Sequence, residues 1–211
     1  MVGTTRSTVI LLLLAGAGQL GRAEAQRAKF TITPFVGAFI PTQELGAIDL
    51  PIGGSTTTVT AELKTGAAFG GRIGFTPAGR FGLEGSYYYA SSGSRISLGI
   101  LGREDDASVQ GGSLKVTFQA TDGSSTTDVI LSAGVSGISR SGDIFRLAQA
   151  VDQFDVGGVV GLGLHLSVSP QVTIRLDGDA SYSKWSWRGS IPNSGQLDLL
   201  LTAGLGLKFG R

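Results

Sequence analysis

The stretch that decides the fold runs from Phe154 to Tyr182 and reads FDVGGVVGLGLHLSVSPQVTIRLDGDASY. In its first half every second residue is apolar or glycine: Phe154, Val156, Gly158, Val160, Leu162, Leu164, Leu166 and Val168. After Ser169-Pro170-Gln171 the alternation resumes and continues to Tyr182. Because strand side chains point to opposite faces with a period of two, this stretch predicts a β-hairpin. One face is apolar, and the other carries glycine, hydroxyl and charged residues.

The same alternation recurs along the chain and predicts eight strands. They cover residues 29–40, 62–76, 81–91, 113–120, 128–138, 154–168, 172–182 and 196–209. Short turns are expected at 77–80, 121–126 and 169–171. Long loops are expected at 41–60, 92–112, 139–152 and 188–195, with one helix-like spacing of apolar residues inside the third. Alternating short and long connections are typical of an all-β, eight-stranded antiparallel up-and-down transmembrane barrel, which closes its first strand on its last.

Residues 1–25 are predicted to be a secretory signal peptide, and residues 26–211 the barrel. Arg6 supplies the positive charge, Val9 to Ala17 the short apolar segment, and Ala23-Glu24-Ala25 the cleavage site. The alternative is a buried N-terminal helix. The apolar run is too short for a transmembrane helix, which needs about 20 residues.

The composition excludes several classes of function. The chain has no cysteine and one histidine, so it offers no disulfide framework and no zinc ligand set, and no metal or cofactor is expected. Without residues 1–25, the chain keeps 15 basic and 15 acidic residues. This balance argues against a nucleic-acid partner, since such proteins carry a basic excess.

The less apolar strand faces carry charges in mid-strand. They are predicted to form an ion-pair network inside the barrel, made of Arg72, Glu84, Lys115, Arg175, Asp177, Asp179 and Asp198. The same faces are rich in glycine, which makes room for crowded side chains inside a narrow barrel. In a soluble sandwich these faces would instead be solvated. A filled interior predicts that the barrel forms no large pore.

Aromatic residues gather toward strand ends on the long-loop side. Tyr87, Tyr89, Tyr182, Trp185 and Trp187 are predicted to form an aromatic girdle at the membrane interface. The alternative is an aromatic cluster in a protein core. The alternation changes after Lys184, which predicts a bulge or a strand end there.

Two stretches resemble a known family. The glycine-rich strand and turn before Val172-Thr173-Ile174-Arg175-Leu176-Asp177, and the last strand around Thr202-Ala203-Gly204-Leu205-Gly206-Leu207, look like the small eight-stranded outer-membrane barrels related to the transmembrane domain of outer membrane protein A. The resemblance implies a bacterial outer-membrane location, contact with outer-membrane lipid, and recognition by the barrel-assembly machinery. Members of that family usually end on an aromatic residue, whereas here Gly210-Arg211 follow Phe209.

A catalytic alternative rests on His165 and Ser167, with Asp177 and Asp179 on the next strand. A serine, a histidine and an acid can activate a hydroxyl nucleophile, and the set is similar to that of the lipid A deacylase barrels. That family, however, uses a glutamate, and the alternation turns His165 away from lipid. We therefore expect no enzyme. The expected role is structural or interaction-based (adhesion or envelope integrity), carried by the long loops and an unidentified loop partner; a soluble periplasmic ligand-binding barrel is the other alternative.

Overall fold

The computed structural model describes residues 28–43, 46–52, 55–98, 101–121, 126–142, 154–185 and 194–209. All regular elements in these ranges are β-strands. Across the same ranges, a search for a helix long and apolar enough to cross a membrane finds none.

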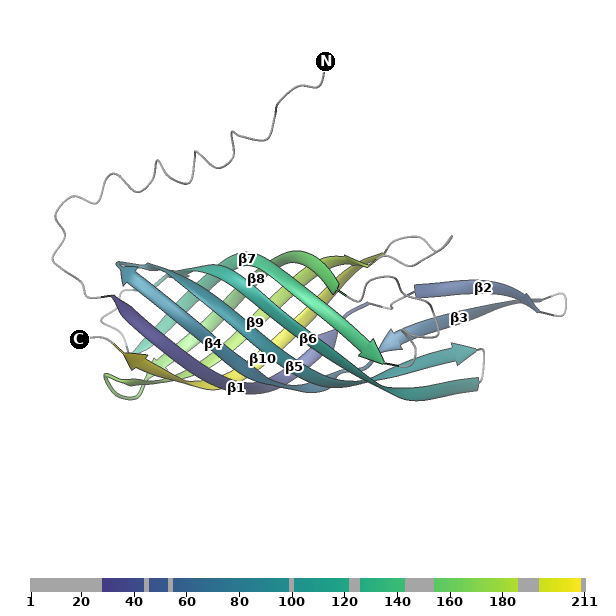
Figure 1. Cartoon of the computed structure of the whole chain (residues 1–211), viewed down its shortest axis with the longest axis horizontal. Helices are drawn as coiled ribbons and strands as arrows, with labels where there is room; N and C mark the ends of the chain where they lie inside the picture. The colour runs from purple at the N-terminus through teal and green to yellow at the C-terminus, as the bar shows by residue number, and fades with distance from the viewer. Residues whose placement is uncertain are drawn as a thin grey trace, which may run out of the picture.

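Eight strands close into an antiparallel barrel (Figure 1). They are β1 (Lys29–Pro41), β4 (Gly66–Ala78), β5 (Phe81–Leu98), β6 (Leu101–Gln119), β7 (Thr127–Gly142), β8 (Phe154–Ser167), β9 (Val172–Trp185) and β10 (Ser194–Phe209). Each pairs with the next along the chain, and β1 pairs with β10 from Phe30↔Phe209 to Pro41↔Asp198. The predicted eight-stranded up-and-down barrel is confirmed.

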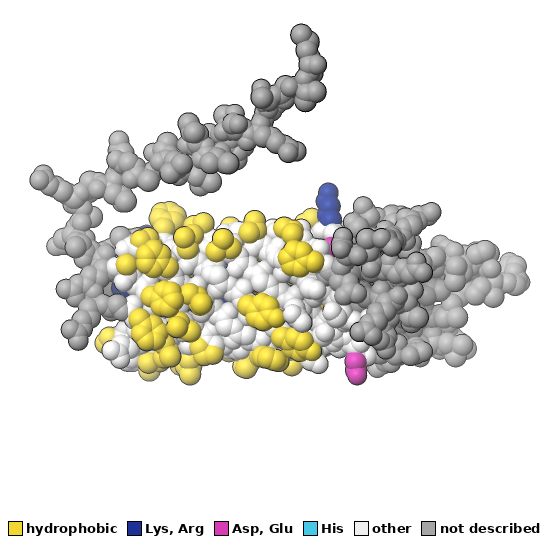
Figure 2. Space-filling view, viewed as in Figure 1, with side chains coloured by type: hydrophobic (Ala, Val, Ile, Leu, Met, Phe, Trp, Pro, Cys, Tyr) yellow, Lys and Arg dark blue, Asp and Glu magenta, His cyan; other side chains and the backbone are white. Residues whose placement is uncertain are grey.

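The apolar face of each barrel strand lies on the outside. In β8, Val156 is 69% exposed and Val160 59% exposed, while Val159 between them is 4% exposed. Figure 2 shows apolar side chains spread over one face of the barrel wall, with the charged side chains of this face toward its ends. We call this outer surface the apolar belt. Because the apolar face surrounds the barrel instead of filling it, the structure favours the transmembrane barrel over the soluble alternative.

The belt has the height of a membrane. A strand tilted by about 40° advances roughly 2.5 Å per residue along the barrel axis. Phe154 and Leu166 of β8 are both exposed. The part of β8 between them therefore spans roughly 30 Å along the barrel axis, close to the thickness of a bilayer's hydrocarbon core.

The predicted turns at 77–80 and 169–171 lie at one end of the barrel, which we call the turn end. Gly79, between β4 and β5, has a φ of 68°, a conformation that glycine adopts without steric cost. Between β8 and β9 the amide of Val172 donates to Ser169 Oγ at 3.1 Å. The first residue of β1 and the last of β10 lie at the same end. We call the opposite end the extended end.

The prediction of a loop over 41–60 is wrong, because this stretch forms β2 (Gly46–Ile52) and most of β3 (Ser55–Leu63). The run from Thr56 to Thr60 is β-branched, which favours a strand. The predicted strand over 62–76 is in fact two, since β3 ends at Leu63 and β4 begins at Gly66. β3 leaves the barrel and pairs with β5 from Val59↔Leu98 to Leu63↔Ser94.

The prediction of a loop over 92–112 is also wrong. β5 continues to Leu98, β6 begins at Leu101, and the two pair along their whole length. The end of β5 near Leu98 and the start of β6 near Leu101 form a four-stranded sheet with β2 and β3. This sheet projects beyond the extended end (Figure 1). We call this sheet the extended wall.

The predicted loop over 139–152 begins later, because β7 runs to Gly142 and pairs with β6 as far as Gly142↔Ala107. The predicted loop over 188–195 ends earlier, since β10 starts at Ser194. The helix-like stretch within 143–153, most of the 121–126 turn and residues 186–193 lie outside the described residues. β9 ends at Trp185, next to Lys184, where the alternation changes.

Candidate functional site

Charged side chains from four strands meet inside the barrel. Arg72 on β4, Glu84 on β5 and Lys115 on β6 face three residues of β9, which are Arg175, Asp177 and Asp179. All six alternate with lipid-facing neighbours, so the alternation that builds the belt also points them inward. We call these six residues the charged layer. Glu84 lies directly beside Lys115 in the register of β5 and β6.

Arg72 joins the two sides of the charged layer. Its Nη1 donates to Asp177 Oδ2 at 2.8 Å, and its Nη2 donates to Asp179 Oδ2 at 3.0 Å. A further bond from Nη1 reaches Thr202 Oγ1 at 2.9 Å. Nε lies 3.6 Å from Glu84 Oε1. The side chain is 1% exposed, so water cannot replace these partners.

The other two cations complete the layer. Lys115 Nζ lies 2.7 Å from Asp179 Oδ1 and 3.2 Å from Glu84 Oε1. Arg175 Nη2 donates to Glu84 Oε2 at 2.6 Å, and its Nε donates to Asp177 Oδ2 at 3.2 Å. Each cation of the layer thus contacts two or more carboxylates. Three positive and three negative groups balance, which is what burial of charge in a low dielectric requires.

Glycine on β8 makes room for the charged layer. A Cβ atom added to Gly161 would collide with the carboxylate of Asp179, and one added to Gly163 would collide with that of Asp177. Both glycines lie beside these aspartates in the register of β8 and β9. The inner face of β8, which supplies no ion to the layer, must therefore stay small at these two positions.

A second ion-pair group lies nearer the extended end. Arg140 Nη1 donates to Asp155 Oδ2 at 2.7 Å, and its Nη2 donates to Asp198 Oδ2 at 2.6 Å. The structure thus places Asp198 apart from the six other residues predicted for the network. Arg140 lies in the predicted loop over 139–152 and is therefore absent from the predicted network. Continuing the alternation of Ser136 and Ile138 by one step would have placed it on the inner face.

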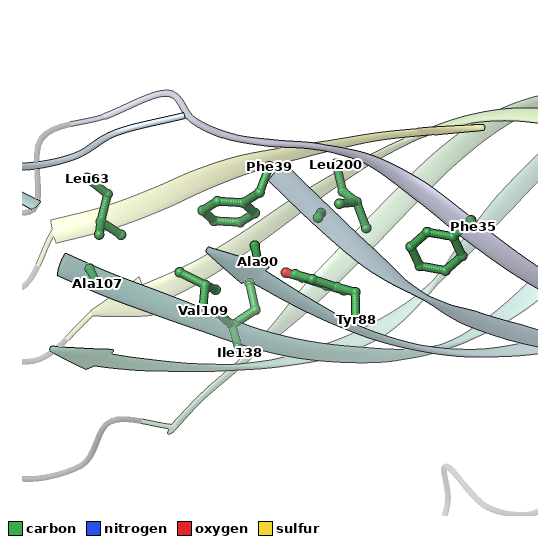
Figure 3. Close-up of a cluster of buried hydrophobic side chains, with 10 residues drawn as sticks. Phe35, Phe39, Leu63, Tyr88, Ala90, Ala107, Val109, Ile138 and Leu200 are labelled. Carbon is green, nitrogen blue, oxygen red and sulfur yellow. The ribbon is translucent and has the colours of Figure 1, made fainter. Parts of the chain in front are cut away.

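An apolar cluster fills the barrel interior between the charged layer and the extended end (Figure 3). Its members are Phe35, Phe39, Leu63, Ala68, Tyr88, Ala90, Ala107, Val109, Ile138 and Leu200. Phe39 stacks on Tyr88 with ring centroids 6.2 Å apart. The Arg72 guanidinium lies 4.5 Å from the centroid of the Phe35 ring, a cation–π contact that joins the cluster to the charged layer.

The structure brings together only part of the set that the catalytic alternative requires. His165 Nε2 lies 3.2 Å from Asp177 Oδ1, and Lys208 Nζ donates to Ser167 Oγ at 3.1 Å. No hydrogen bond joins His165 to Ser167 among the described residues. Both residues alternate with the lipid-facing Leu164 and Leu166 and so face the interior. Among all the residues that the structure describes, no group of three histidine, aspartate or glutamate side chains is placed to hold a metal ion.

The tyrosines predicted for the girdle lie on the outer surface near the extended end. Tyr87 is 58% exposed and Tyr182 is 50% exposed, and Tyr89 packs on Phe69 with ring centroids 5.5 Å apart. The side chain of Trp185 and all of Trp187 lie outside what the structure describes. At the turn end, phenylalanines lie on the outer surface of the barrel, and Phe81 packs on Phe118 with ring centroids 5.0 Å apart.

Comparison with solved structures finds the same fold. The outer membrane protein OprG from Pseudomonas aeruginosa superimposes with a TM-score of 0.65 at 16% sequence identity, over 86% of this chain and 96% of OprG. Neisserial surface protein A superimposes with a TM-score of 0.54 at 15% identity, over 86% of this chain and 99% of that protein. No protein-family model matches the sequence, and no curated protein matches it either. At these identities the likeness establishes the fold and leaves the function to be argued from this chain.

Proposed function

We propose that this small β-barrel of the outer-membrane type has a structural or interaction role in the bacterial envelope (adhesion or envelope integrity) and forms no large pore. The turn end faces the periplasm, and the extended wall faces outward, because barrels of this kind have short periplasmic turns and longer extracellular connections. The apolar belt contacts outer-membrane lipid. The partner of the extended wall is a molecule of the cell exterior.

The proposal includes how the chain is exported and assembled. Residues 1–25 act as a signal peptide, so the mature chain starts at Gln26, three residues before β1. At the other end, Phe209 closes β10 and is 50% exposed on the outer surface. We propose that the barrel-assembly machinery reads this last strand.

The closed interior is the observation that carries the proposal. The charged layer is held by ion pairs of 2.6 to 3.6 Å. The apolar cluster lies next to it, on the side of the extended end. An eight-stranded barrel has an interior only wide enough for side chains. A solute crossing this barrel would have to displace buried, paired charges. The contacts of His165 and Ser167 support a packing role for both, so the proposal includes no enzymatic step.

The conductance of the barrel tests the closed interior. We expect the purified chain, folded in planar lipid bilayers, to show no stable conductance steps in the nanosiemens range, because the charged layer blocks the axis. A porin of known conductance, inserted in the same bilayers, provides the positive control. Stable nanosiemens steps that scale with the amount of this chain would contradict a closed interior.

Shortening the extended wall tests the interaction role. Replacing residues 94–105 by Asn-Gly removes the protruding parts of β5 and β6 and leaves the pair Gly93↔Asp106 to close the hairpin. We expect cells that express this variant to lose the surface attachment, or the resistance to detergent, that the full chain confers. Heat-modifiable gel migration checks that the shortened barrel still folds. A folded, shortened barrel that keeps both properties would contradict a role for the part of the extended wall that β5 and β6 form.

A further inference from the structure

A small cavity lies between the charged layer and the apolar cluster. Its volume is about 10 Å³, the lower limit of the space that one water molecule requires. The polar groups that line it come from β5, β6, β7 and β9, and they are Ser86, Tyr88, Ser113, Ser136, Asp179 and Ser181. The cavity thus has about the size of a single water molecule, and its wall includes several hydroxyl groups and one carboxylate.

One of these groups has no hydrogen-bond partner in the part of the chain that the structure describes. Ser136 is 5% exposed, and its Oγ has no hydrogen bond to the described residues. Ser86 and Ser113, by contrast, share a bond of 2.7 Å between their Oγ atoms. A buried hydroxyl without a partner costs free energy that a bound water recovers. The unpartnered hydroxyl of Ser136 and the cavity that it lines are independent observations of one site.

The charges around the cavity decide what it binds. Asp179 already accepts bonds from Arg72 at 3.0 Å and Lys115 at 2.7 Å. The two cations disfavour a metal ion, and the carboxylate disfavours an anion. A water molecule is neutral, fits the volume, and can both donate and accept. We infer that this cavity binds one internal water molecule, held by Ser136 and its neighbouring hydroxyl and carboxylate groups. The inference does not depend on the partner of the extended wall.

Methyl groups in the cavity wall provide the test. Ile138, Val159 and Leu200 line the same cavity. In the full chain, methyl-labelled and folded in lipid nanodiscs, we expect water-to-methyl nuclear Overhauser effects at these three residues, with the sign of a slowly tumbling bound molecule. The lipid-facing methyls of Val160 and Leu162 are the matched control and should show none. Absence of the effect at all three cavity residues overturns the inference.

A substitution locates the site. Ser136→Val removes the hydroxyl and adds methyl volume, so all three effects should vanish while the methyl shifts of Ile174 and Leu176, on the outer surface of β9, stay unchanged. Effects that persist at full strength in folded Ser136→Val place the water elsewhere and also overturn the inference. If that variant does not fold, the wild-type measurement alone decides, because it requires no substitution. Conductance plays no part in either readout, so failure here is distinguishable from failure of the closed-interior proposal.

Discussion

Replacing Arg72 by alanine should lower the free energy of unfolding by about 3–5 kcal/mol, the range for breaking a buried ion pair by removing one partner. Arg72 bridges Asp177, Asp179 and Glu84 with a side chain that is 1% exposed. Its loss leaves the charged layer with one excess negative charge inside the barrel. Urea-induced unfolding in lipid vesicles measures the effect.

Two further variants separate loss of charge balance from loss of packing. Arg80→Ala removes an exposed arginine at the turn end and should change the unfolding free energy by less than about 0.5 kcal/mol. The double variant Arg72→Met with Asp177→Asn restores the balance and should recover about 1 kcal/mol or more of the loss, as expected for coupled neighbours. If Arg72→Ala destabilises no more than Arg80→Ala, the charged layer does not contribute to stability as described.

Introducing arginine into the middle of the apolar belt should strongly lower the free energy of unfolding only if that surface contacts lipid. Val160→Arg is expected to lower the unfolding free energy by about 2–4 kcal/mol, the cost of a cation near the bilayer midplane. Val160 is 59% exposed, so in a water-soluble barrel the same change would be nearly neutral. Urea-induced unfolding in vesicles again gives the measurement.

The chain offers a matched control for depth. Val168 is 64% exposed and follows β8 at the turn end, so Val168→Arg changes the same residue type at similar exposure but near the interface. Its expected cost is about 0–1 kcal/mol. Equal costs at the two positions would mean that depth in a bilayer does not set the energy of the belt.

The membrane-spanning part of the fold could be predicted from the sequence because the residue types are restricted on both faces of its strands. Lipid on one side requires apolar residues, and the narrow interior on the other requires small or paired polar ones. The alternation of β8 therefore identified Val160 as outward and His165 as inward, as the structure places them. In the parts of the strands beyond the membrane, the residue types are no longer restricted in this way. The run from Ser91 to Ser94 has a serine or glycine at every position, so the predicted strand ends at Ser91, whereas β5 continues to Leu98.

The candidate site was predictable by face but not by partner. Alternation points Asp179 and Asp198 inward, but it carries no information on the stagger of the strands. That stagger brings Asp179 to Arg72 and Lys115 on the far side of the barrel, while Asp198 pairs with Arg140. Arg140 itself lies between Ser139 and Ser141, where the outer face no longer carries apolar residues that would reveal a strand.

The division of charge among the strands has a consequence for how the barrel enters the membrane. β4, β5 and β6 bring two cations and one anion to the charged layer, whereas β9 brings one cation and two anions. Neither set is neutral alone, and 105 residues separate Arg72 from Asp177. A partly inserted sheet would expose uncompensated charge to lipid, so strands cannot enter one by one at low cost. Charge balance inside the barrel therefore requires β9 to be in place together with β4, β5 and β6.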